Sequence, residues 1–232
     1  TTLFVAAEKQ LIDNLRGEQA SLRSSALFIQ QLSQVTYTSQ SRYDIPFSYS
    51  ANIWDGLYKV INNLQEIILL NSDPQTKDLV TASGAGRNST QIAISRILKS
   101  YAFYALTDIF GDIPYHSYGN DDTDFEALQQ DEDNITPAYA SQEKIYKDIL
   151  NELKQASDTL LLFSSERTFG TSDIIYGGDN LKWAKFANSL RLRFATRLKV
   201  KDPTLYQSHF EDALTKGVFT SNEDNAIYSY SA

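Results

Sequence analysis

Residues 88–110 constrain the fold more than any other segment, because they are predicted to form a helix that is apolar nearly all around its axis. A helix of this kind is buried between other helices. Gly111 can adopt the left-handed conformation that closes a helix, and Pro114 cannot continue one. The sequence therefore predicts a central buried helix that ends abruptly at Gly-Asp-Ile-Pro-Tyr. Its large apolar residues are Ile92, Ile94, Ile97, Leu98, Tyr101, Phe103 and Leu106.

Helical periodicity and helix-boundary residues predict six further helices, so that the chain is expected to be all-α with about seven helices in antiparallel pairs. Ser50, Ser141 and Asp202 are in positions to cap three of them, and Gly217 is in a position to end the last. Strand signals are weak and confined to 217–220 and 226–230. We expect one helical domain over 1–232. The six further helices are predicted at 3–15, 18–35, 50–70, 141–161, 182–198 and 203–217.

Three predicted connections are long and polar: 36–49, 71–87 and 111–140. Connections of this length inside a helical domain are usually functional or mobile. The sequence has no strict repeat period. Successive helix pairs nevertheless follow the logic of tetratricopeptide arrays, without their consensus residues.

The bulk composition excludes several classes of protein. The formal net charge of −8 and pI near 4.8 argue against nucleic-acid binding, which needs a basic face. No apolar run reaches the roughly 18 residues of a membrane span, and no signal peptide is evident. Cysteine is absent, which excludes disulfides and zinc–cysteine sites. Methionine is also absent, so we expect a processed or trimmed form of a longer product.

Signals for catalysis are weak. The only two histidines, His116 and His209, lie on different predicted elements, and no Gly-x-Ser-x-Gly motif is present. The glycines of 83–90 lack the lysine of a phosphate-binding loop. The acidic segment 120–134 is best interpreted as a solvated charge run. Calcium binding and a carboxylate pair for glycoside hydrolysis are the alternatives. The basic helix at 182–199 is expected to pair with acidic neighbours.

The segment 36–55 combines aromatic rings with polar side chains, as carbohydrate recognition requires. Flat rings stack against the apolar faces of sugars, and amides, carboxylates and arginine bind the hydroxyls. The alternative is that the rings pack the loop onto the helices, and Trp54, at helical spacing from Tyr58, fits that alternative best. The candidate ligand-binding residues are Tyr37, Tyr43, Asp44, Tyr49 and Trp54.

Three stretches together resemble the SusD/RagB family of Bacteroidetes outer-membrane lipoproteins, most closely its SusD-like branch. The first is 91–115, ending in Gly-Asp-Ile-Pro-Tyr, and the second is 137–156. The third is 174–199, which contains Gly177-Gly178-Asp179, Lys182-Trp183 and Asn188-Ser189-Leu190-Arg191. Their order and spacing both match the family, and the similarity covers nearly the whole chain.

The resemblance implies an irregular tetratricopeptide-like scaffold with long surface loops and a role in carbohydrate uptake. Members are lipid-anchored at the cell surface and cap a SusC-type TonB-dependent transporter. They bind glycans or, in some cases, peptides, and they are not enzymes and need no cofactor. The lipidated cysteine is expected upstream of Thr1, and the chain is about half the usual family length, so part of the ligand site is expected outside it. The alternatives are a peptide-binding member and a tetratricopeptide-type scaffold without a small ligand.

Overall fold

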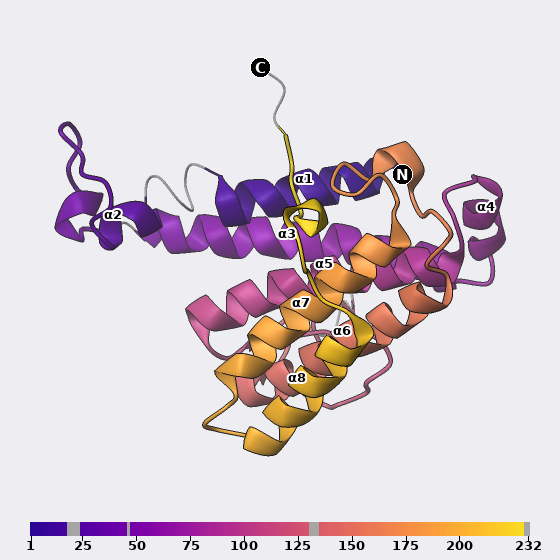
Figure 1. Cartoon of the computed structure of the whole chain (residues 1–232). Helices are drawn as coiled ribbons and strands as arrows, with labels where there is room; N and C mark the ends of the chain where they lie inside the picture. Colours follow the sequence, from indigo (N-terminus) through magenta and orange to yellow (C-terminus); the bar gives the residue numbers. More distant parts are fainter. Residues whose placement is uncertain (18–23, 46, 130–134, 230–232) are drawn as a thin grey trace.

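The computed structural model describes residues 1–17, 24–45, 47–129 and 135–229, and over these ranges the protein is all-α, as predicted (Figure 1). Helices α1 and α3 lie side by side, and α7 and α8 form a second pair across the molecule. The α-helices are α1 (Thr2–Arg16), α2 (Ala26–Phe28), α3 (Phe47–Ser72), α4 (Lys77–Ala82), α5 (Asn88–Phe110), α6 (Gln142–Leu162), α7 (Asn180–Arg197) and α8 (Pro203–Lys216). Short 3₁₀ turns are η2 (Gln40–Arg42), η3 (Gly170–Ser172) and η4 (Asn222–Asp224).

The predicted starts of α6 and α8 are confirmed by their caps. The side chain of Ser141 accepts a hydrogen bond from the backbone N–H of Lys144 at the start of α6. Asp202 caps α8 in the same way, ahead of Pro203 in its first turn, and Gly217 follows its last residue. Helix α7 begins two residues earlier than predicted, because Asp179 caps it. These signals are local, so they can be read directly from the sequence.

The predicted helix over 18–35 is wrong in its described part. Residues 18–23 lie outside the described ranges, and beyond them only the three residues of α2 are α-helical. Gln30 has a φ of 60°, which ends the helix. The apolar residues that suggested a helix, Ile29, Leu32 and Val35, are 64%, 48% and 96% exposed. Since a short helix is stable mainly through packing of its apolar face, this segment lacks the surface it would need.

Three smaller expectations also need correction. Helix α3 begins at Phe47, so Ser50 lies inside it and does not cap it. The predicted connection 71–87 contains the end of α3 and the short helix α4. The weak strand signals at 217–220 and 226–230 form no strand within the described residues. The first of these segments contacts α7 through a hydrogen bond from the backbone N–H of Phe219 to Oγ of Ser189.

Helix α5 is the centre of the structure, as its all-round apolar pattern predicts. It packs against α3 on one side and α6 on another, while α7 packs against α6 and α8. Its rings are part of this scaffold. Tyr104 stacks on Phe194 of α7 with ring centroids 3.6 Å apart, and Phe103 contacts Tyr115 at 4.6 Å. The aromatic run in 101–110 therefore joins α5 to its neighbours.

A buried ion pair joins α5 to α6. Arg96 and Glu152 are 5% and 3% exposed, and Nε of Arg96 donates to Oε2 of Glu152 at 2.7 Å. Nη2 of Arg96 also donates to Gln155 at 2.7 Å. The other oxygen of Glu152 accepts hydrogen bonds from Oγ of Ser117 at 3.1 Å and from the backbone N–H of Tyr118 at 3.0 Å. This network satisfies two charges that would be costly to bury alone.

Further hydrogen bonds to α6 and α3 fix the chain that follows α5. The Tyr115 hydroxyl, which is buried, donates to Asp148 of α6 at 2.7 Å, and Nδ2 of Asn120 donates to the other oxygen of Asp148 at 2.6 Å. The Tyr58 hydroxyl of α3 donates to the carbonyl of Pro114 at 2.6 Å. Strand β1 (Ile113–Pro114) pairs antiparallel with β2 (Tyr139–Ala140), which leads into α6. The start of the long connection 111–140 is thus part of the core.

A second buried acidic group joins α1 to the segment before α7. Glu8 is fully buried and accepts a hydrogen bond from the backbone N–H of Ile174 at 3.0 Å. Burial, and then the neighbouring Asp173, raise the pKa of Glu8 to about 10. Asp173 accepts hydrogen bonds from the backbone of Gly178 and from the indole N–H of Trp183, at 2.8 and 2.7 Å. Gly178 has a φ of 84°, and a Cβ there would lie 2.6 Å from the carbonyl oxygen of Thr168, so only glycine fits.

We expect Glu152→Ala to lower the free energy of unfolding by about 3–5 kcal/mol, because it leaves the buried Arg96 without its partner. The matched control is Glu143→Ala, which removes an exposed pair with Lys147 on the same helix and should cost only about 0.3–0.5 kcal/mol. Urea denaturation followed by circular dichroism measures both. Equal losses for the two variants would contradict the structural role of the buried pair.

We also expect the stability to depend on pH through Glu8. The pKa of Glu8 is about 10 in the folded protein and 4.5 in the unfolded chain. At a pH between these two values, the side chain therefore releases a proton when the protein unfolds. The stability that the protonated Glu8 side chain contributes to the folded protein is complete below pH 4.5. It is lost as the pH rises, by up to about 1.4 kcal/mol per pH unit. Glu8→Gln removes the titration. The variant should therefore gain stability relative to the parent between pH 5.5 and pH 8 in urea denaturation, and parallel pH profiles would refute the assignment.

Candidate functional site

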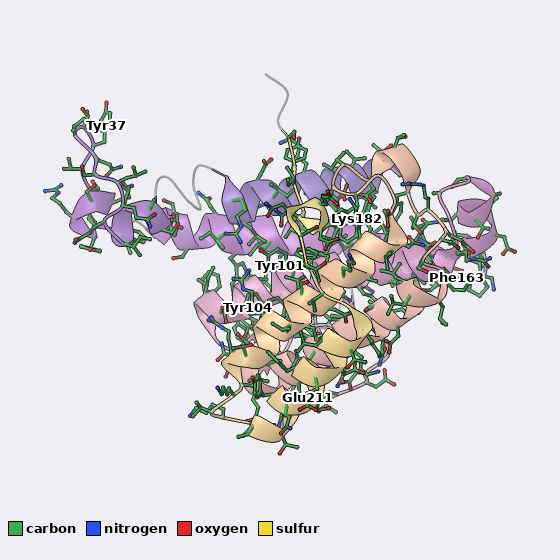
Figure 2. The ribbon with its side chains drawn as sticks, viewed as in Figure 1. Tyr37, Tyr101, Tyr104, Phe163, Lys182 and Glu211 are labelled. Atoms are coloured by element: carbon green, nitrogen blue, oxygen red, sulfur yellow. The ribbon has the colours of Figure 1, made fainter. Side chains whose placement is uncertain are left out.

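Residues 26–45, which we call the arm, project beyond the paired ends of α1 and α3 (Figure 1). Two of the predicted ligand-binding residues lie on it as open rings: Tyr37 is 88% exposed and Tyr43 is 53% exposed. Figure 2 shows Tyr37 at the tip, far from Tyr101 and Tyr104 in the body of the molecule. Both arm tyrosines adopt left-handed backbone conformations, with φ of 56° and 61°. Such conformations are unusual for residues other than glycine and mark a locally constrained loop.

Phe28, which the sequence analysis did not select, organises the arm. Tyr43 stacks on it with ring centroids 6.2 Å apart, and Tyr49 contacts it edge-on at 6.5 Å. The Tyr43 hydroxyl donates to the carbonyl of Phe28 at 3.0 Å and accepts a hydrogen bond from Gln30 at 3.1 Å. Asp44 follows and is exposed. The structure therefore brings Tyr43 and Tyr49 together around Phe28, with Asp44 beside them in the chain.

Trp54 belongs to a different aromatic cluster. Its ring contacts Tyr58 on the same helix at 4.9 Å and meets Phe110 edge-on at 5.1 Å. It is partly buried and packs against the core, in line with its helical spacing from Tyr58. It also stacks with Tyr139 of β2, with ring centroids 6.3 Å apart and an interplanar angle of 24°. Tyr139 is 61% exposed and could not be associated with Trp54 from sequence alone.

The acidic segment 120–134 is partly described, since residues 130–134 lie outside the described ranges. Nζ of Lys144 contacts Asp122 and Asp124 at 2.9 and 2.7 Å. The backbone N–H of Asp124, and then Lys144, hold the pKa of Asp122 below its usual range. Within the described part of the chain, no three acidic or histidine side chains are grouped as metal ligands would be. Asp122 and Asp124 thus help to hold the loop against α6.

The two histidines lie on different segments, His116 after β1 and His209 on α8, and each has a structural partner. Nε2 of His116 lies 3.3 Å from the side-chain nitrogen of Gln65, and Nδ1 of His209 accepts a hydrogen bond from Arg191 at 2.9 Å. Burial lowers the pKa of each to about 4, assisted by Lys99 and Arg191 respectively. Both rings are therefore neutral near pH 7.

The basic helix at 182–199 pairs with acidic neighbours, as expected. Lys185 binds Asp224 at 2.8 Å, and Arg191 binds Asp212 at 2.6 Å. These charges are engaged within the fold, so they do not form a free cationic surface. The described chain also has no helix that is long and apolar enough to cross a membrane.

A family model, SusD-like, described as starch-binding associating with outer membrane, matches residues 1–232. A search of curated protein sequences found no match. Among solved structures, a chitin-binding protein is 27% identical with a TM-score of 0.74, and the alignment covers 97% of this chain and 45% of that one.

Two further structures show the same relationship. A SusD-like protein of Bacteroidetes is 27% identical with a TM-score of 0.71, over 97% of this chain and 38% of that one. A chitin-binding SusD homologue from Flavobacterium johnsoniae is 24% identical with a TM-score of 0.66, over 97% and 46% of the two chains. The chain thus spans less than half the length of each of these three relatives. With the whole sequence matched and the same helical fold, the chain belongs to the SusD-like family of starch-binding, outer-membrane-associated proteins.

Proposed function

We propose that the chain is part of a cell-surface protein that captures oligosaccharides, without turning them over, and passes them to a SusC-type TonB-dependent transporter. The observation that supports this most directly is the exposed aromatic arm on a scaffold of the SusD-like family. Outer-membrane attachment through a lipid anchor is part of the same proposal. It rests on the family, which is described as associating with the outer membrane.

The chemistry of the arm suits sugars. Tyr37 and Tyr43 expose flat apolar rings, and Asp44 supplies a hydrogen-bonding carboxyl group beside them. Tyr43 is fixed by two hydrogen bonds and by stacking on Phe28, so one ring is held in place before a ligand arrives. Preorganisation of this kind reduces the entropic cost of binding.

The net charge and the relatives narrow the ligand class. A chain with a formal net charge of −8 repels polyanionic glycans, so neutral oligosaccharides are favoured. Two of the similar structures are named as chitin-binding proteins. Oligomers of N-acetylglucosamine are therefore the first ligands to test, followed by glucose oligomers because the family is described as starch-binding.

The transporter partnership is tested by isolating the full-length, lipidated protein from gently solubilised outer membranes of its host. We expect a TonB-dependent transporter to copurify in equal amount. Failure to recover any transporter in several mild detergents would refute this part of the proposal. A panel of oligosaccharides and oligopeptides, measured by calorimetry, then separates glycan capture from peptide capture. Binding of neither class would favour a protein scaffold.

The arm and Tyr49, which lies in the first turn of α3 and contacts Phe28 of the arm, are tested by substitution. Tyr43→Ala combined with Tyr49→Ala should abolish oligosaccharide binding in calorimetry and leave the helical circular dichroism unchanged. Tyr37→Ala, which removes an exposed ring, should weaken binding by about threefold to tenfold, the value of a good aromatic contact.

The matched control for these variants is Val35→Ala. Val35 lies on the same arm and is 96% exposed, but it offers no ring. We expect the Val35→Ala variant to bind oligosaccharides with the affinity of the parent protein. Parental affinity in both the double variant and Tyr37→Ala would show that the arm is not the binding site.

A further inference from the structure

We propose that Trp54 and Tyr139 form a second platform for a neutral oligosaccharide, separate from the arm. This inference rests on the proposed function, since it names another surface on which the same class of ligand would bind. The two rings come from α3 and β2 and lie near parallel, 24° apart in plane, with centroids 6.3 Å apart. At this centroid separation the two rings are offset and overlap little, and Tyr139 is 61% exposed, so apolar surface remains for a sugar unit to contact.

Polar groups lie beside Trp54, one of the two rings, on one face of α3. A shallow cavity of about 290 Å³ is lined by Trp54, Asp55, Tyr58, Lys59, Asn62 and Leu128. Asp55, Lys59 and Asn62 are exposed, and their side chains make no hydrogen bond or ion pair within the described part of the chain. A carboxyl, an ammonium and an amide group together can donate to and accept from sugar hydroxyls. The site therefore has the few polar groups beside an apolar surface that ligand sites require.

The platform is held rigidly from behind. Phe110 meets the Trp54 ring edge-on, and the hydroxyl of Tyr58 is fixed to the carbonyl of Pro114. Burial, and then the neighbouring Tyr139, raise the pKa of the Tyr58 hydroxyl, so it remains a proton donor at neutral pH. Tyr139 is placed by the pairing of β2 with β1, in which it lies opposite Pro114. Both rings are thus positioned by the core network.

The opposite charges at the cavity favour an uncharged ligand over a highly charged one. Asp55 and Lys59 are one helical turn apart and carry opposite charges, so together they leave the cavity close to neutral. A polyanionic or polycationic ligand would gain little from such a pair. Uncharged sugars can use both as hydrogen-bonding groups.

Tryptophan fluorescence provides a reporter of this site. The sequence has two tryptophans, and Trp183 is fully buried, with its indole N–H donated to Asp173. A sugar that stacks on Trp54 should shift its emission and leave that of Trp183 unchanged. The experiment titrates the protein with hexamers of N-acetylglucosamine and of glucose, and follows emission alongside calorimetry. Trp54→Phe should remove the emission change.

The decisive variant is Tyr139→Ala, because the Tyr139 side chain is 61% exposed and its loss leaves the backbone pairing of β2 in place. We expect the sugar concentration that produces half of the emission change to rise by about threefold to tenfold. Tyr139→Phe, which keeps the ring, should behave as the parent. Val200→Ala, at an 87% exposed position outside both proposed sites, is the control and should leave the emission titration unchanged.

The outcomes separate this inference from the proposed function. Calorimetric binding of a hexamer without any emission change, or with an emission titration that Tyr139→Ala leaves unchanged, would overturn the second platform and leave glycan capture standing. An emission change produced only by oligopeptides would also overturn it. Absence of calorimetric binding for every sugar would overturn both proposals.

Discussion

The ion pair between Arg96 and Glu152 is the interaction on which the arrangement of α5, α6 and the chain between them depends. Two buried charges require every hydrogen-bonding position around them to be filled, and an apolar pair would impose no such demand. The second carboxylate oxygen of Glu152 accepts hydrogen bonds from Ser117 and from the backbone N–H of Tyr118. The connection after α5 must therefore return to α6 at this point. The turn at Gly111 and Pro114 directs it there.

Features that depend on neighbouring residues could be predicted from the sequence, whereas features that depend on the assembled fold could not. Helices α6 and α8 begin at capping side chains and α5 ends at Gly111, so these bounds follow from nearby residues. The segment 29–35 has a helical pattern without a surface to pack on, and no local signal reveals that absence. Contacts between distant residues, such as Arg96 with Glu152 56 residues later, or Trp54 with Tyr139, depend on the assembled fold. The sequence could identify the type of ring at the candidate site but not its partners.

The rings of the chain divide into two groups by their neighbours. Tyr104 is buried and stacked on Phe194, and Tyr115 is buried with its hydroxyl on Asp148, so both serve the scaffold. Tyr37 and Tyr139 have the same side chain but leave most of it in solvent. Tyrosine suits both uses, since it offers a large apolar face and one polar group. A high tyrosine content alone therefore does not indicate a binding surface.

The arm is built almost entirely from contacts between residues close in sequence. The Tyr43 hydroxyl bonds to residues 13 and 15 positions earlier, and Gln34 bonds to Ser41, seven positions away. Because these bonds draw nothing from the α5–α6 network, changes in the arm carry little penalty for the scaffold. Insertions, deletions and exchanged rings could accumulate there while the helices stay constant. The arm is thus the part of this structure most open to evolutionary change, and descendants of one scaffold could diverge in what they recognise through this segment alone.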